Sequence, residues 1–140
     1  MDLEISQIME TNIGLLQANA AFFVGWSILL WMMFRGVTNA NIYGANTFAK
    51  AIHSVFSLCV VAFFFSVYGN ITSLINNWAM ALSETSEELP GGLVMFVERT
   101  GATEYTNPSL IPSDPLGLVL MIVVLVGLIG GMWTAPAPKE

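Results

Sequence analysis

The chain has 140 residues, of which 55% are hydrophobic and only 10% are charged, and its net charge is −6. A soluble protein of this size needs more polar side chains than this to cover its surface, so lipid or partner proteins must cover the remainder. Only four residues are basic, and no two of them are adjacent, which excludes an extended nucleic-acid surface. Composition therefore predicts an integral membrane protein with no nucleic-acid partner.

Three stretches of the chain contain no charged residue: Gly14–Phe34, Ala51–Ser83 and Pro115–Pro138. A hydrocarbon core of about 30 Å requires about 20 apolar residues in a helix, so each stretch can supply one transmembrane helix. We therefore predict an all-α integral membrane protein that forms a single membrane domain over residues 1–140. Its three transmembrane helices are expected at residues 14–34, 49–69 and 116–133.

The segment before the first span has a helical pattern of its own. Residues 2–12 place apolar side chains at helical spacing opposite acidic ones, which predicts a short amphipathic helix at the headgroup boundary or leading into the span. The same segment lacks the basic region of a signal peptide, so we expect it to be retained. Arg35 and Gly36 are expected to end the first helix, because a cation and a glycine both suit a helix C-terminus. Residues 37–46, rich in Asn and Gly, then predict a solvated turn.

The second helix is predicted to extend beyond its apolar part. Thr47 is the expected N-cap, and an amphipathic pattern continues past residue 69 to residue 82. A continuous helix of that length would measure about 54 Å, so it must protrude from the bilayer, tilt or kink, with Gly69 as the expected site of a bend. The polar face of this extension comprises Asn70, Ser73, Asn76 and Asn77.

Residues 83–114 form the one long polar segment, and six of its side chains are acidic. Ordering so long a loop costs conformational entropy, so we expect a neighbouring soluble domain or a basic surface to hold it. An apolar run within it predicts a short hairpin strand or a segment that dips into the interface, and this run is the expected partner contact. The run is Leu93, Val94, Met95, Phe96 and Val97. Asp114 and Pro115 are expected to start the third helix as its cap and first-turn residue.

Charge is distributed unequally across the three predicted spans. Arg35, Lys50 and Lys139 lie on one side, whereas the other side holds Arg99 with nine of the ten acidic residues. The positive-inside rule then places the C-terminus in the cytoplasm, and the N-terminus and the acidic loop outside.

Candidate chemistry is sparse. No span contains Asp or Glu, and none of the familiar hydrolase, phosphate-binding or zinc motifs is present, so we expect neither enzymatic activity nor a cofactor. His53 is the single ionisable candidate. It could contact a metal, a haem or a quinone, or carry a proton, but one imidazole lacks companion ligands. The favoured interpretation is an interfacial histidine bonded to a carbonyl or a headgroup.

Stripes of small residues indicate close helix packing. They are Gly14, Ala18, Ala21 and Gly25 in the first span, and Gly127 and Gly131 in the third. The leading interpretation is a non-catalytic structural or accessory subunit that packs against other integral subunits and lipid in a larger multi-subunit membrane complex. The alternative is a homo-oligomeric pore, channel or holin-like protein. In that case Gln17, Asn19, Ser27 or the polar face of the second helix would line water.

Overall fold

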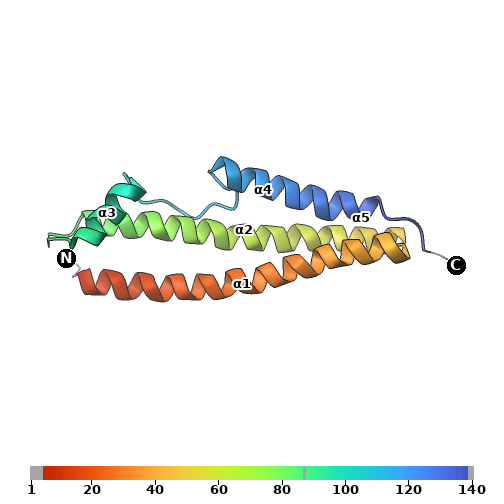
Figure 1. The fold of residues 1–140 in the computed structure, drawn as a ribbon, viewed down its shortest axis with the longest axis horizontal. Helices are drawn as coiled ribbons and strands as arrows, with labels where there is room; N and C mark the ends of the chain where they lie inside the picture. The colour runs from red at the N-terminus through yellow and green to blue at the C-terminus, as the bar shows by residue number, and fades with distance from the viewer. Residues whose placement is uncertain (1–4, 87, 139–140) are drawn as a thin grey trace.

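The computed structural model describes residues 5–86 and 88–138, and this part of the chain is helical, with no strand (Figure 1). Predictions that involve residues 1–4, Glu87 or Lys139 fall outside the described residues. Three of its helical stretches are long and apolar enough to cross a membrane. The helices are α1 (Ile5–Tyr43), α2 (Thr47–Ser83), α3 (Gly91–Thr100), α4 (Pro115–Leu125) and α5 (Gly131–Trp133), with a π-helical turn, η1 (Val126–Gly130), between the last two.

Helix α1 is one unbroken helix of 39 residues. The predicted amphipathic segment therefore leads directly into the span, but the predicted end at Arg35 is wrong. The helix continues to Tyr43 and ends at Gly44, whose φ of 85° and N–H bond to the carbonyl of Ala40 form the left-handed terminus. The predicted turn of ten residues shrinks to residues 44–46. Within the added helical turns, the side chain of Asn41 donates to the carbonyl of Val37 at 2.9 Å and to the carbonyl of Gly131 in the third apolar stretch at 3.0 Å.

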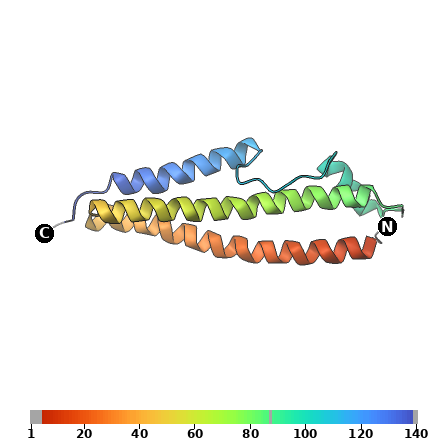
Figure 2. The ribbon, with the colours of Figure 1, turned by 180° about the vertical axis from the view of Figure 1, so that it is seen from behind.

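Helix α2 is also continuous, over 37 residues, and therefore confirms the predicted extension. Its N-cap is Asn46 rather than the predicted Thr47, since the Asn46 carboxamide accepts the backbone N–H of Ala49 at 2.8 Å. The chain stays helical through Gly69, where a bend was expected. Together α1 and α2 form a long antiparallel hairpin (Figures 1 and 2).

The core lies where α1, α2 and the third predicted crossing, α4 to α5, meet. Two aromatic contacts join α1 to α2. The rings of Phe23 and Phe64 lie 4.8 Å apart, and Trp26 stacks on Phe63 at the same distance with an interplanar angle of 6°. The fully enclosed side chains at the centre of the core are Val60, Val61, Phe65 and Leu128.

The third crossing, α4 to α5, lies along only half of the hairpin, beside the second half of α1 and the first half of α2 (Figure 1). Polar contacts hold both of its ends to α2. Asp114 caps α4 as predicted, accepting the N–H of Gly117 at 2.6 Å, and it also accepts the hydroxyl of Tyr68 at 2.7 Å. At the other end the ammonium of Lys50 donates to the carbonyl of Ala135. A cation suits the carbonyls left unpaired at a helix C-terminus.

The other half of the hairpin is accompanied by the acidic loop and α3 instead of a third span (Figures 1 and 2). Its surface is also different. Along α2, large apolar side chains are strongly exposed up to Phe63, whereas none from residue 64 to residue 74 is exposed. Most of the other strongly exposed apolar side chains lie on α4 to α5 or on the part of α1 beside it. This apolar belt therefore surrounds the half that contains all three apolar helical stretches.

Candidate functional site: a polar pocket under the acidic loop

The polar face predicted on the extension of α2 holds the acidic loop. The carboxamide of Asn77 bonds both backbone groups of Thr106, donating to its carbonyl at 2.9 Å and accepting its N–H at 2.8 Å. The hydroxyl of Ser73 donates to the same carbonyl at 2.6 Å, and Asn76 donates to the carbonyl of Glu104 at 2.8 Å. Ser73 is buried by this contact. The loop backbone, rather than water alone, occupies this face.

Close approach of the loop to α2 depends on Gly69. A Cβ atom at this position would overlap the carbonyl oxygen of Ser109 and would lie 2.9 Å from its carbonyl carbon. Gly69 therefore allows the backbone of the loop to lie directly on the helix. At the far end of α2 the hydroxyl of Tyr105 donates to Glu84 at 2.8 Å, and this bond raises the pKa of Tyr105.

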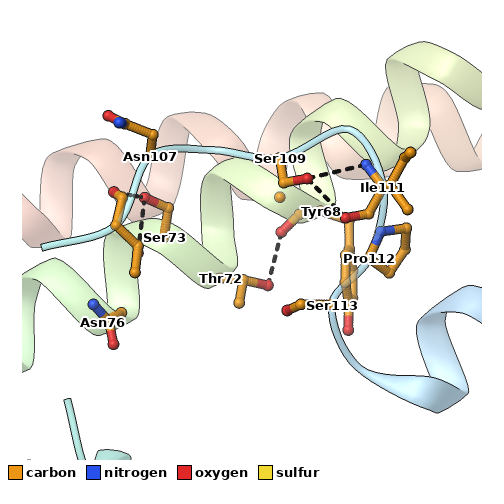
Figure 3. A pocket seen from close by; sticks show the side chains of 11 residues that line it. Tyr68, Thr72, Ser73, Asn76, Asn107, Ser109, Ile111, Pro112 and Ser113 are labelled. Atoms are coloured by element: carbon orange, nitrogen blue, oxygen red, sulfur yellow. Dashed lines mark hydrogen bonds between the residues drawn. The ribbon is translucent and has the colours of Figure 1, made fainter. Parts of the chain in front are cut away.

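Between α2 and the loop lies a pocket of about 330 Å³ (Figure 3). The helix contributes side chains such as Tyr68 and Thr72, and the loop contributes residues between Thr106 and Ser113. The lining groups are hydroxyls, amides, backbone carbonyls and apolar carbons, with no carboxylate, imidazole, amine or thiol. Such a lining can hydrogen-bond a neutral polar group or water. It offers neither a general base nor a set of metal ligands.

Several hydroxyls of the pocket are already engaged within the protein. Thr72 donates to the carbonyl of Tyr68 at 3.0 Å, and Ser109 donates to the carbonyl of Ile111 at 2.8 Å (Figure 3). Ser109 also accepts the N–H of Ile111 at 3.2 Å, which closes a local turn. These hydroxyls are therefore engaged within the protein, and the bonds between Ser109 and Ile111 hold the loop in the segment that precedes the third crossing.

Asp114 ends that segment, and its ionisation is linked to folding. Accepting the N–H of Gly117 and then the hydroxyl of Tyr68 lowers the pKa of the Asp114 carboxyl below its ordinary value of 3.8. The carboxylate form is therefore the one that stabilises the fold, fully above pH 3.8 and progressively less as the pH falls through the lower folded-state pKa.

We expect Asp114→Asn to remove this pH dependence. The carboxamide oxygen can still accept the N–H of Gly117, so the variant changes the charge while keeping the cap shape. The measurement is thermal unfolding in detergent from neutral pH to below 3.8. The native protein should lose stability relative to the variant only in the acidic part of that range. A constant difference between the two at every pH would contradict the assignment.

His53 lies at the other end of the molecule, one helical turn after Lys50. Its imidazole packs against α1 at Gly36, where a Cβ atom would lie 3.0 Å from Cε1 of the ring. The Nε2 atom is enclosed and has no hydrogen-bond partner among the residues that the structure describes. Residues 5–86 and 88–138 contain no group of three or more His, Cys, Asp or Glu side chains placed to hold a metal ion. In the described residues, His53 therefore packs against Gly36 of α1 and has no companion metal ligands beside it.

The two predicted small-residue stripes have different surroundings. In the third crossing, Cβ atoms at Gly127 and Gly131 would lie 3.0 Å from the ring of Phe34 and 2.8 Å from the side chain of Val37. These glycines therefore pack against α1 of the same chain. The stripe on α1 faces away from α2 and is exposed at all four positions, and nothing lies within 4 Å of a Cβ built at either of its glycines. Its members are Gly14, Ala18, Ala21 and Gly25.

The apolar run in the acidic loop is helical, so its interpretation as a hairpin strand is wrong. The run lies in α3, whose N-terminal glycines and left-handed C-cap, Gly101, bound one short helix. The ring of Phe96 packs on Trp78 of α2 with centroids 5.2 Å apart, whereas Met95 is 70% exposed. One side of α3 therefore packs against α2, and its other side is exposed. Leu93 and Val97 are half-buried, and Val94 is exposed.

Sequence reasoning identified the polar face of α2 but missed the pocket. Its two walls come from segments about 35 residues apart, so no local pattern predicts that they meet. The usable signal was Gly69, placed one helical turn before Ser73. No protein family, curated protein or solved structure that was compared with the chain matches it.

Proposed function

We propose that this chain is a non-catalytic structural or accessory subunit of a larger membrane complex. The observation that carries the proposal is the exposed small-residue stripe on α1. Close helix approach in a membrane depends on such stripes, because lipid gives apolar side chains no reason to prefer protein. The stripe of the third crossing packs against α1 of the same chain, whereas no helix in the described part of the chain packs against the stripe from Gly14 to Gly25. A partner helix would complete it.

The placement in the bilayer follows from the third crossing. Its 19 residues measure about 28 Å as a helix, which matches the hydrocarbon core. Lys50 and Tyr68, which hold its two ends, lie about 27 Å apart along α2. The apolar belt covers the same length. The remaining ends of α1 and α2 then stand about 20 Å beyond the bilayer, and they carry α3 and the acidic loop. Phe23 packs on Phe64 and Trp26 packs on Phe63, so Tyr68 lies level with about residue 20 of α1. Ala21 and Gly25 of the stripe therefore lie inside the proposed bilayer near its edge, and Gly14 and Ala18 lie on the helix that continues beyond it.

The orientation expected from charge can be tested by cysteine labelling. With Cys59 replaced by alanine, Thr103→Cys in the loop should react with an impermeant maleimide from the non-cytoplasmic side only. Thr134→Cys, at the opposite end of the third crossing, should react from the cytoplasmic side only. Both positions are exposed, so access depends on the membrane rather than on the fold. The reverse pattern would overturn the proposed orientation.

Ala21→Leu is expected to weaken assembly, because added volume on the stripe holds the partner helix away. The matched control is Ala20→Leu. Ala20 is also exposed but points about 100° away around the helix. The measurement is the native mass of the complex after extraction in mild detergent. Loss of unlike partners in the Ala21 variant alone supports the proposal, and identical masses for both variants and the native protein contradict it.

The pore alternative needs free polar side chains to line water, but most of the candidate side chains already hydrogen-bond within the protein. The face of α2 binds the loop backbone, and in α1 the side chains of Asn19 and Ser27 donate to carbonyls one turn earlier. Gln17 remains exposed on α1. The same native mass separates the two functions, since a pore would give a ring of one chain and a subunit would bring unlike chains.

A further inference from the structure

The outward face of α1 carries a row of four residues spaced four apart, which we call the Arg35 row. Its members are Trp31, Arg35, Asn39 and Tyr43. Residues at this spacing lie one above another on a helix, so the row runs along α1 for about 18 Å. All four side chains are exposed, and with their neighbours they line a groove of about 450 Å³. The neighbours are Phe34, Thr38 and Ile42.

Arg35 has a stacking partner but no anion. Its guanidinium carbon lies 5.9 Å from the centre of the Trp31 ring, within range of a cation–π contact. From residue 11 to residue 83 the sequence contains no Asp or Glu, so no carboxylate of α2 or of the rest of α1 can pair with it at this level. The side chains of Asn39 and Tyr43 also lack hydrogen-bond partners among the described residues. Among residues 5–86 and 88–138, the row thus presents a planar cation with no carboxylate partner and two neutral polar groups with no hydrogen-bond partner.

The row crosses the proposed boundary of the hydrocarbon core. Gly36 contacts His53, one turn from Lys50, and Lys50 marks the end of the third crossing. Arg35 therefore lies within the last turn of the hydrocarbon layer, with Trp31 deeper and Tyr43 outside it. A charge at that depth is costly unless its side chain reaches the interface and pairs there. The anion available along this lipid-facing surface is the phosphate of a phospholipid.

We propose that the Arg35 row binds the headgroup of an anionic phospholipid. The planar guanidinium pairs with the phosphate, and Asn39 and Tyr43 hydrogen-bond the polar part of the head. Phe34, the apolar neighbour at the depth of Arg35, lies beside the acyl chains. The row lies at the basic end of the molecule, so the lipid belongs to the cytoplasmic leaflet, where anionic lipids attract basic residues. This assignment rests on the bilayer placement proposed above, which cysteine labelling tests independently.

The test is a lipid titration of the full-length protein in detergent, read by native mass spectrometry. The probes are phosphatidylglycerol and phosphatidylcholine. The native protein should retain phosphatidylglycerol in preference, and Arg35→Gln should weaken that retention about tenfold, the loss of one charge-assisted hydrogen-bonded pair. The Arg35→Lys variant should retain phosphatidylglycerol to a degree between the native protein and the glutamine variant, because an ammonium keeps the charge but not the planar fork of donors. The Tyr43→Phe variant should lose less of the preference for phosphatidylglycerol than either Arg35 variant.

The matched control is Arg99→Gln, which removes the same charge from α3 at the other end of the hairpin. It should leave lipid retention unchanged. Equal losses in the two glutamine variants, or equal retention of both lipids by the native protein, would overturn the site. Displacement of the lipid by millimolar inorganic phosphate would show that the row recognises phosphate alone, which also contradicts the lipid assignment. Arg35 lies outside the core, so the variants should keep the native helical content, checked by circular dichroism.

Discussion

Gly69→Ala is expected to release the acidic loop from α2. The added Cβ atom would overlap the carbonyl oxygen of Ser109, which belongs to the backbone and cannot rotate away. Alanine favours the helix itself by about 1 kcal/mol, but overpacking costs about 1–3 kcal/mol and an overlap with backbone is the severe case. The helix therefore persists and the loop moves. The measurement is hydrogen exchange at the amide of Thr106, whose protection depends on Asn77.

Gly91→Ala provides the control for this experiment. Nothing lies within 4 Å of a Cβ atom built at Gly91, so the same chemical change there meets open space. It should leave the exchange rate of the Thr106 amide unchanged. Cleavage by a protease specific for glutamate gives a second readout, since release of the loop exposes the backbone at Glu104. Unchanged exchange and cleavage in the Gly69 variant would show that the loop is not held on α2.

Gly131→Leu is expected to push the third crossing away from α1. A Cβ atom at this position already lies 2.8 Å from Cγ1 of Val37, and a β-branched valine in a helix has almost no freedom to rotate. The larger leucine should therefore lower the free energy of unfolding by about 1–3 kcal/mol. The measurement is denaturation in mixed detergent micelles, followed by near-ultraviolet circular dichroism.

The adjacent glycine supplies a matched control in the same turn. A Cβ atom at Gly130 meets only a side chain of its own helix, Cγ1 of Val126, at 4.0 Å. Gly130→Leu should therefore change the free energy of unfolding far less than Gly131→Leu. Equal effects would show that the loss comes from the general replacement of glycine in this segment, rather than from contact with Val37.

The start of the third helix and the end of the first show why some boundaries could be predicted and others could not. Asp114 and Pro115 form a signal within a single turn, and the structure has the cap where it was predicted. Arg35 and Gly36 resemble a terminus equally well, yet α1 continues. Gly36 instead makes room for the imidazole of His53, on the facing helix. A glycine suits both roles, and only the contact decides between them.

The sequence by itself determined the all-helical class, the three apolar helices and the helical extension of α2 beyond its apolar part, because each depends on side chains that are neighbours along one helix. The tertiary structure decided which surfaces of these helices are in contact and which remain exposed. It placed Thr106 on Asn77, and Ser109 on Gly69. It also packed one small-residue stripe against α1 and left the other exposed. Each outcome depends on atoms from segments tens of residues apart, whose meeting follows from packing rather than from any local pattern.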